Sequence, residues 1–345
     1  MSSYNRLEPA DKVVSTDKIT TNTWVNNLGT LNNIHSSSTN AVYSDSTSQG
    51  NFFIEAYYHD PSLTSSAEVQ FTVGYGHKGG SGSANFTNTS GALGNTATKC
   101  IYNQYRQLVF GDETSEFTFD GVVATDIWVV NVARSRYKHS LKAGSLNLRL
   151  NDGTNKLDFT DDSKTSSGSA TITNIGRQFN LVSGSDGVRL GTTLSQTDSG
   201  SYGFFYPDAG IIIFNGNALR VKTPAYWLAG GSYTAQKLNE KLYTAMSKSS
   251  ADTGFGFEVD SEEKVSSQYN FIRVKNSEFN YSSNPSYIDN NGNLNNDTFA
   301  DSPVTYITTI GLYNDDNNLL AVAKLSQPLK KDFTTETLVR VKLDY

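Results

Sequence analysis

The sequence predicts a mainly β protein with sandwich- or barrel-like antiparallel sheets, about two short helices and an extended N-terminal arm. Two observations support this fold class. Short apolar stretches with period-2 alternation recur along the chain, and turn signals separate them at roughly the 8–12-residue spacing of β sandwiches and barrels. Charged residues make up only 18% of the chain, and the low charge is balanced by Ser, Thr, Asn and Gly, a mixture that suits strands joined by many turns.

The length of 345 residues exceeds the usual size of one domain. We therefore expect an extended arm over residues 1–50, a β-rich domain over 51–200 and a second β-rich domain with one helix over 201–345. Aromatic residues make up 12% of the chain, which is too many for a disordered protein, because aromatic side chains supply the buried area that offsets chain entropy.

Charge and hydropathy exclude several classes of partner. A net charge of −6 disfavours sequence-independent binding to nucleic acid, which needs a concentrated basic surface. The segment Met1–Asp17 has no apolar run, and no stretch approaches the roughly 20 apolar residues of a membrane span. We expect no nucleic-acid partner, no membrane partner and synthesis in the cytosol. The single Cys100 excludes an intrachain disulfide and is expected to be a small buried residue.

The N-terminal arm carries only Trp24, Leu28, Leu31 and Ile34 as apolar anchors. So few anchors cannot order a long segment by themselves. We expect the arm to stay mobile or to dock on another subunit, and this makes Trp24 a candidate interaction residue.

The first half of the chain contains one helix candidate, Thr98–Phe110, with Ile101, Tyr105 and Leu108 at helical spacing and Gly111 as its stop. The tract Asn151–Ser169 is dominated by turn formers and is expected to be a long turn region. The expected strands are Asn51–Tyr58 paired with Glu68–Tyr75, Ile127–Val132, Ser145–Leu150, and a hairpin of Ser169–Asn174 with Arg177–Val182.

The second half contains the other helix candidate, Ser232–Ser247, in which Leu238, Leu242 and Met246 recur every four residues. A hairpin of Gly203–Tyr206 with Gly210–Phe214, turning at Pro207–Asp208, is expected to be the best-buried element. Further strands are expected at Phe271–Lys275, Val304–Tyr313, Leu319–Leu325 and Leu338–Leu343.

The search for chemistry finds no recognised catalytic or metal-binding pattern. The four histidines are widely spaced, and none stands in a known metal-binding frame. Gly74–Gly79 matches G-x-G-x-x-G, but no amphipathic helix follows, so a flexible loop is expected instead of a phosphate site. Carboxylate pairs such as Asp161–Asp162 and Glu262–Glu263 are expected on the solvated surface. We predict a protein without catalytic, cofactor-binding or metal-binding residues.

Two Asp/Asn-rich loops, 151–162 and 289–301, keep open the alternative of a calcium site, although neither has EF-hand spacing and turn chemistry explains them more simply.

The C-terminal third carries the most distinctive text: Phe271–Ile288 holds R-x-K-N-x-E-x-N-x-S-x-N-P, Tyr306–Asn314 holds Y-x-T-T-x-G-L-Y-N, and Leu319–Lys330 begins L-L-A-V-A-K-L-S. This text, over roughly Ser201–Tyr345, resembles virion structural proteins of T4-like tailed phages, the cyanophage-type myoviruses and their relatives. The resemblance implies a non-enzymatic structural subunit of a baseplate, tail or neck. Such a subunit would be assembled in the host bacterial cytoplasm and held in the virion by other structural proteins, as a homo- or hetero-oligomer.

The same residues suggest where neighbours bind. Asn280–Asn284 can hydrogen-bond their own backbone and Pro285 restricts Asn284, so this stretch is either a rigid presenting surface or an ordinary long loop. The last strand could close a sheet or add to a neighbour's edge. The candidate interaction residues are Trp24, Tyr281, Asn284, Pro285, Arg340 and Lys342.

Two other functions stay open at the level of sequence. The Tyr- and Asn-rich loops are compatible with a receptor- or glycan-binding module or a capsid-decorating surface protein. A cell-wall glycosidase would rest only on scattered carboxylates.

Overall fold

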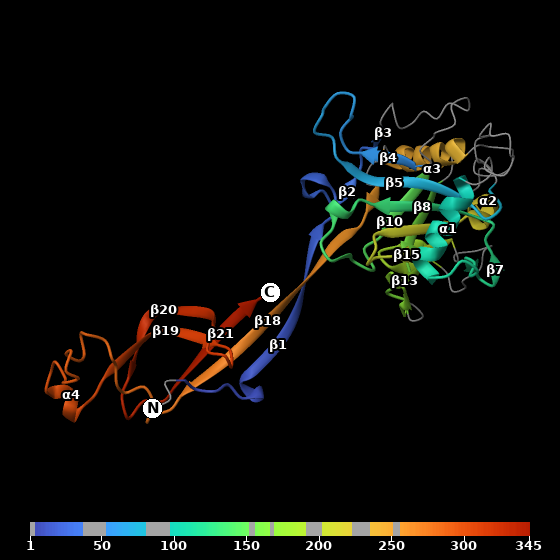
Figure 1. Cartoon of the computed structure of the whole chain (residues 1–345). Helices are drawn as coiled ribbons and strands as arrows, with labels where there is room; N and C mark the ends of the chain where they lie inside the picture. The colour runs from blue at the N-terminus through green and yellow to red at the C-terminus, as the bar shows by residue number, and fades with distance from the viewer. Residues whose placement is uncertain are drawn as a thin grey trace, which may run out of the picture. The chain divides into compact units, whose positions relative to one another are not determined.

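The computed structural model describes residues 4–36, 53–80, 97–151, 156–165, 169–190, 202–222, 235–250 and 256–345. It confirms the predicted fold class, because the described chain is mainly β and its sheets are antiparallel, one of them curled into a half-barrel (Figure 1). The chain divides into two compact units. We call Met1–Lys18 with Lys264–Tyr345 unit 1, and Ile19–Glu263 unit 2.

Unit 2 is built on a large sheet of 13 strands. In spatial order its main path runs through β2 (Thr30–Leu31), β17 (Phe257–Glu258), β10 (Asn147–Asn151), β11 (Lys156–Asp161), β13 (Gly176–Ser185), β15 (Gly203–Tyr206), β16 (Ile211–Asn215), β8 (Asp126–Val132), β5 (Val69–His77), β4 (Phe53–Tyr57) and β3 (His35–Ser36). The short strands β12 (Thr171–Thr173) and β14 (Val188–Arg189) pair with β13.

The central strands of this sheet are buried on both faces, which explains their uninterrupted apolar sequence. In β8, Ile127 and Val129 enter one hydrophobic cluster while Trp128 and Val130 enter another. Neighbouring β16 alternates in the same way, since successive strand residues point to opposite faces. The predicted hairpin β15–β16 is confirmed, and all five residues of β16 are buried.

A helix covers each face. α1 (Ala97–Phe110) supplies Ile101, Tyr102, Tyr105 and Val109 to one cluster, and α3 (Ala235–Ser250) supplies Leu238, Leu242 and Met246 to the other. Both predicted helices are confirmed. One detail of α1 was wrong: Leu108 is 40% exposed and Val109 takes the inward position, because 101, 105 and 109 continue one helical face.

Gly111 ends α1 as predicted. Its N–H donates to Gln107 O at 2.9 Å, and its φ of 77° lies in the left-handed region that glycine adopts without strain. Two further helices within the described residues, α2 (Gly216–Lys222) and α4 (Thr298–Asp301), were not predicted. No helix in the part of the chain that the structure describes has the length and apolar character to cross a membrane.

The tract Asn151–Ser169 is not only a turn region. It contains β11, whose Phe159, Thr160 and Asp161 are buried between β10 and β13. Polar residues fill this strand because their side chains hydrogen-bond to the backbone, as Thr160 Oγ1 does in donating to Leu146 O at 2.7 Å. The large sheet also runs across residue 200, since β13 pairs with β15.

The N-terminal arm is only in part an isolated segment. Within it, Trp24, Leu31 and Ile34 are buried in unit 2, and Leu31 pairs with Phe257 through β2 and β17. The expectation that the arm is mobile or docks on another subunit is therefore wrong for these residues. A few anchors suffice here because they close over the curled sheet of their own chain. Residues 37–50 lie outside the described residues.

Unit 1 contains a second sheet and a separate hairpin. The sheet has the order β1 (Lys12–Asn22), β18 (Asp260–Val274), β21 (Thr337–Asp344), and β9 (Ser140–Leu141) pairs with the start of β18 inside unit 2. The hairpin joins β19 (Thr305–Tyr313) to β20 (Leu319–Lys331) through the predicted tight connector, where Asn314 Oδ1 accepts from Asn318 N at 2.7 Å. A small hairpin of β6 (Thr118–Phe119) and β7 (Val122–Val123) belongs to unit 2.

Candidate functional site

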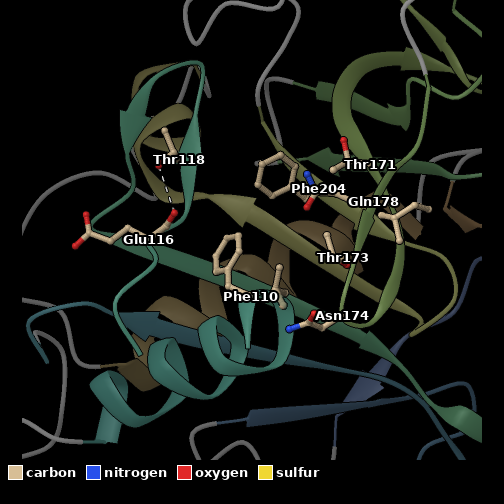
Figure 2. A pocket seen from close by; sticks show the side chains of 10 residues that line it. Phe110, Glu116, Thr118, Thr171, Thr173, Asn174, Gln178 and Phe204 are labelled. Carbon is tan, nitrogen blue, oxygen red and sulfur yellow. Dashed lines mark hydrogen bonds between the residues drawn. The ribbon is translucent and has the colours of Figure 1, made fainter. Parts of the chain in front are cut away.

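A groove of about 440 Å³ opens in unit 2 between the end of α1, the hairpin β6–β7 and the strands β12, β13 and β15 (Figure 2). Three separate parts of the sequence meet in it, so no local motif marks it. Its lining residues are Val109, Phe110, Glu116, Thr118, Thr171, Ile172, Thr173, Asn174, Gln178 and Phe204.

Two phenyl rings form the apolar part of the groove. Phe110 is held by Phe117, with ring centroids 5.1 Å apart, and Phe204 is held by Phe119, with centroids 4.6 Å apart. Phe117 and Phe119 are fully buried in the cluster under α1. The rings of Phe110 and Phe204 are therefore fixed from behind, and each keeps a half-buried surface toward the groove.

Hydroxyl and amide groups form the polar part. The Tyr206 hydroxyl donates to Gln178 Oε1 at 2.9 Å, which orients the amide and leaves the Gln178 Nε2 donors without a partner among the described residues. The Thr173 hydroxyl donates to Gly176 O at 2.9 Å and retains its capacity to accept. Among the described residues, the side chains of Thr171 and Asn174 form no hydrogen bond.

Gly111 has a second role at this groove. A Cβ at this position would lie 2.2 Å from Asn174 Nδ2, so only glycine gives the Asn174 side chain its place. The Asn174 N–H donates to Val109 O at 3.4 Å, which ties β12 to the end of α1.

The groove is close to neutral. Glu116 is its only charged lining residue, and its carboxylate pairs with the Lys78 ammonium. An uncharged ligand with apolar and hydroxyl-bonding parts fits this lining better than a phosphate or a carboxylate, which needs a basic partner.

Unit 1 presents a different surface, made of exposed apolar side chains. Thirteen of the 21 large hydrophobic residues that are exposed within the described chain belong to unit 1, and we call them the apolar surface of unit 1. They are Tyr4, Val13, Val14, Phe279, Tyr281, Tyr306, Tyr313, Leu319, Leu320, Val322, Phe333, Leu338 and Tyr345.

Trp24, a candidate interaction residue from sequence, does not belong to any exposed surface. Its side chain is 2% exposed and its ring lies 4.7 Å from Phe257 and 6.4 Å from Phe71. The correction has a simple reason: Phe71 and Phe257, which cover Trp24, come from strands far from it in sequence, and local patterns do not reveal them.

Tyr281, Asn284 and Pro285 lie in the long loop that follows β18. Tyr281 is 60% exposed, while Asn284 Oδ1 accepts from Ser286 N at 3.2 Å and Pro285 O accepts from Asn295 Nδ2 at 2.7 Å. Side chains of this loop therefore bond to its own backbone, and its role as a presenting surface stays a prediction.

Buried Lys331 fixes the start of that loop. Its ammonium donates to Asn276 O at 2.8 Å, Asn280 Oδ1 at 2.7 Å and Asp332 O at 2.7 Å, so every N–H of the ammonium has a partner. Burial lowers the pKa of Lys331 because the charged form is desolvated. Sequence reasoning missed this residue, since lysine is seldom buried.

Arg340 and Lys342 project from the exposed face of β21. The Arg340 guanidinium carbon lies 5.6 Å and Lys342 Nζ 5.9 Å from the centre of the Tyr269 ring, and Lys342 pairs with Asp344 at 2.9 Å. β21 ends the sheet and pairs only with β18 among the described strands. Whether another chain adds to this edge remains a prediction.

The glycines of the G-x-G-x-x-G match serve packing. Gly74 and Gly76 lie inside β5 rather than in a loop, and a Cβ on Gly76 would lie 2.8 Å from the backbone nitrogen of Tyr102. Glycine therefore lets α1 approach the strand closely. The expected flexible loop beyond residue 80 lies outside the described residues.

The carboxylate pair Asp161–Asp162 is buried, contrary to the expectation of a solvated surface. Asp161 accepts from Gly144 N at 2.9 Å, and Asp162 accepts from Asn180 N at 3.0 Å and from Asn180 Nδ2 at 2.8 Å. Burial raises the pKa of Asp162 despite these hydrogen bonds. Glu262 of the second pair is also buried.

In the loop 289–301, the Asp289 carboxylate accepts its hydrogen bonds from the same loop. Asp289 Oδ1 accepts from Asn291 N at 2.8 Å and from Asn293 N at 2.7 Å, and these hydrogen bonds lower its pKa. Part of the other Asp/Asn-rich loop lies outside the described residues. Among the described residues, no group of three or more His, Cys, Asp or Glu side chains is placed to hold a metal ion.

Cys100 is exposed, not buried as expected, because the inward face of α1 begins at Ile101 and Tyr102. No family model, no curated protein and no solved structure gives a significant match to this chain.

Proposed function

We propose that this chain is a non-enzymatic structural subunit of a tailed-phage virion, a component of the baseplate, tail or neck that acts through protein–protein assembly. The main observation behind the proposal is that most of the exposed large apolar residues of the described chain belong to unit 1. The motifs of the C-terminal third, which resemble T4-like virion proteins, lie almost entirely in this unit.

The hairpin β19–β20 supports the proposal that unit 1 binds a neighbour. Two strands alone are marginally stable in water. One face of the hairpin carries a row of half-buried apolar side chains, and the other carries exposed Tyr306, Tyr313, Leu319 and Val322. Only four buried hydrophobic residues lie in unit 1 within the described chain: Val274, Tyr287, Val339 and Val341.

A permanent position in a particle accounts for this exposure. Obligate interfaces typically bury about 2,000 Å² or more and resemble a domain core divided between chains. The apolar side chains that are exposed in the single chain would form one side of such an interface.

Mass spectrometry of purified particles of the phage that encodes the chain tests whether the protein is part of the virion. We expect the chain among the virion proteins at a fixed copy number. Its absence from particles would refute the proposal.

A pair of variants tests the surface. Leu320→Lys with Val322→Lys charges the exposed side of the hairpin, and we expect a soluble, folded chain that no longer enters particles. Leu63→Lys, at the most exposed large apolar residue of unit 2, is the matched control and should be incorporated normally. Equal incorporation of both variants would show that the apolar surface of unit 1 is not an assembly surface.

A further inference from the structure

We propose that the groove between α1, β6–β7 and β12 binds an uncharged sugar residue of a glycan. The inference concerns unit 2 and does not depend on the station of the protein in a particle. It rests on the residues that line the groove and on the way the surrounding chain holds them.

The lining matches the two chemical sides of a sugar ring. A pyranose has an apolar face of C–H groups and a rim of hydroxyls, each of which both donates and accepts hydrogen bonds. Phe110 and Phe204 offer aromatic surface for the apolar face, and the Gln178 amide, the Thr171 hydroxyl and the Asn174 amide offer partners for the rim (Figure 2).

The groove is preformed. Its volume of about 440 Å³ lies within the range of roughly 300–1,000 Å³ found for small-molecule sites. Phe117 and Phe119 fix the two rings, Tyr206 fixes the Gln178 amide, and Gly111 gives the Asn174 side chain its place. Because the two rings and the Gln178 amide are already held, their ordering costs little entropy on binding, which favours even a small ligand.

Other ligand classes fit less well. A peptide could add to the edge of β12, but that strand has only three residues and its end is already bonded to α1 through Asn174. A phosphorylated or carboxylated ligand would meet Glu116 and no basic lining residue. A purely apolar ligand would strip water from the Gln178 and Asn174 amides without replacing their hydrogen bonds.

Saturation-transfer NMR on the full chain tests the proposal. The probes are glucose-, galactose- and N-acetylglucosamine-terminated neutral oligosaccharides at about 1 mM, a concentration that detects weak binding. We expect transfer to the protons on one face of the terminal ring in at least one probe. Absence of transfer from every probe would overturn the proposal.

Two variant pairs locate the binding. Thr118→Trp fills the groove from the exposed side of β6 and should abolish transfer, whereas Val122→Trp, on the other strand of the same hairpin and outside the lining, should preserve it. Asn174→Ala should weaken affinity about 3- to 10-fold through the loss of a hydrogen bond, while Gln104→Ala, an exposed amide of α1, should have no effect.

Thermal unfolding of each variant shows whether it is folded. Sugar binding that survives both Thr118→Trp and Asn174→Ala would place the ligand elsewhere and overturn the assignment. Selective retention of an extended peptide from a peptide array, lost in Thr118→Trp, would overturn the sugar class in favour of strand addition at β12.

Discussion

Units 1 and 2 are built from similar strands but bury them differently. Both contain long antiparallel strands rich in Val, Ile, Leu and Tyr. Of 48 buried hydrophobic residues in the described chain, all but four belong to unit 2. The cause is the number of layers: in unit 2 an α-helix covers each face of the sheet, whereas the only α-helix described in unit 1 is the four-residue α4. Strand sequence alone therefore does not produce a core.

The largest effect should come from the core of unit 2. Trp128→Ala removes a fully buried ring that contacts Tyr75 and donates from Nε1 to Leu238 O at 3.2 Å. We expect a loss of about 3–5 kcal/mol in the free energy of unfolding, measured in urea, because a large cavity forms. Leu320→Ala on the exposed hairpin of unit 1 should change it by about 0.5 kcal/mol or less. Similar losses in both variants would remove the contrast between the units.

Lys331→Met tests the hydrogen bonds of the buried Lys331 ammonium, which hold the long loop of unit 1 where few apolar residues are buried. The change removes the ammonium donor from Asn276 O, which keeps a hydrogen bond from Asn280 Nδ2, and leaves Asn280 Oδ1 without its buried donor. We expect the loop to open more easily by about 2–3 kcal/mol, seen as faster hydrogen exchange near Asn280. Exchange in α1 and β8 should not change. Lys330→Met, at an exposed neighbour, is the control and should leave the loop protected.

Gly76→Ala tests the close approach of helix to strand in unit 2. The new Cβ would overlap the Tyr102 backbone, which must shift, so we expect a loss of about 1–3 kcal/mol in stability. Gly79→Ala, two residues beyond the end of β5, should be nearly neutral, because its Cβ would meet the His77 ring at an ordinary contact distance of 3.4 Å. Equal effects would indicate that the glycines serve the loop and not the packing.

The smallest effect should be an opposite pH dependence at one buried carboxylate of unit 2 and at three carboxylates of unit 1. Burial raises the pKa of Asp162 in unit 2, so between its unfolded pKa near 3.9 and its folded pKa the native state binds more protons and stability falls as pH rises. Asp162→Asn should remove this part of the slope, measured by urea unfolding at a series of pH values from about pH 4 upward.

In unit 1, hydrogen bonds lower the pKa values of Asp289, Asp332 and Asp344. Their contribution is present above the unfolded pKa and is lost as pH falls through the folded values. The hydrogen-exchange protection of the loops in unit 1, measured relative to the intrinsic exchange rate at each pH, should therefore fall as the solution is acidified below about pH 4. A contribution of the same sign from Asp162 and from these three carboxylates would contradict the assignments.

Much of the secondary structure was predictable, because hydrophobic period is a local property. The continuous run Ile127–Val132 predicted a buried strand, and Leu238, Leu242 and Met246 predicted the inward face of α3. The prediction failed at the end of β11, where Thr160, Asp161 and the following Asp162 are buried polar residues that no local pattern distinguishes from a turn. It also failed at Trp24, which was predicted to be an interaction residue and is buried, since an isolated aromatic residue does not identify what covers it.

The sequence by itself determined the class of the fold, the two principal helices, the end of α1 at Gly111, and the hairpins β15–β16 and β19–β20. Tertiary structure decided which strands acquire a second layer, and hence which apolar residues become core and which remain exposed. It also brought Phe110, Gln178 and Phe204 together from α1, β13 and β15 into one groove. The reason is physical: periodicity and turn chemistry act over a few residues, whereas burial and the assembly of a site depend on strands that pair across long stretches of chain.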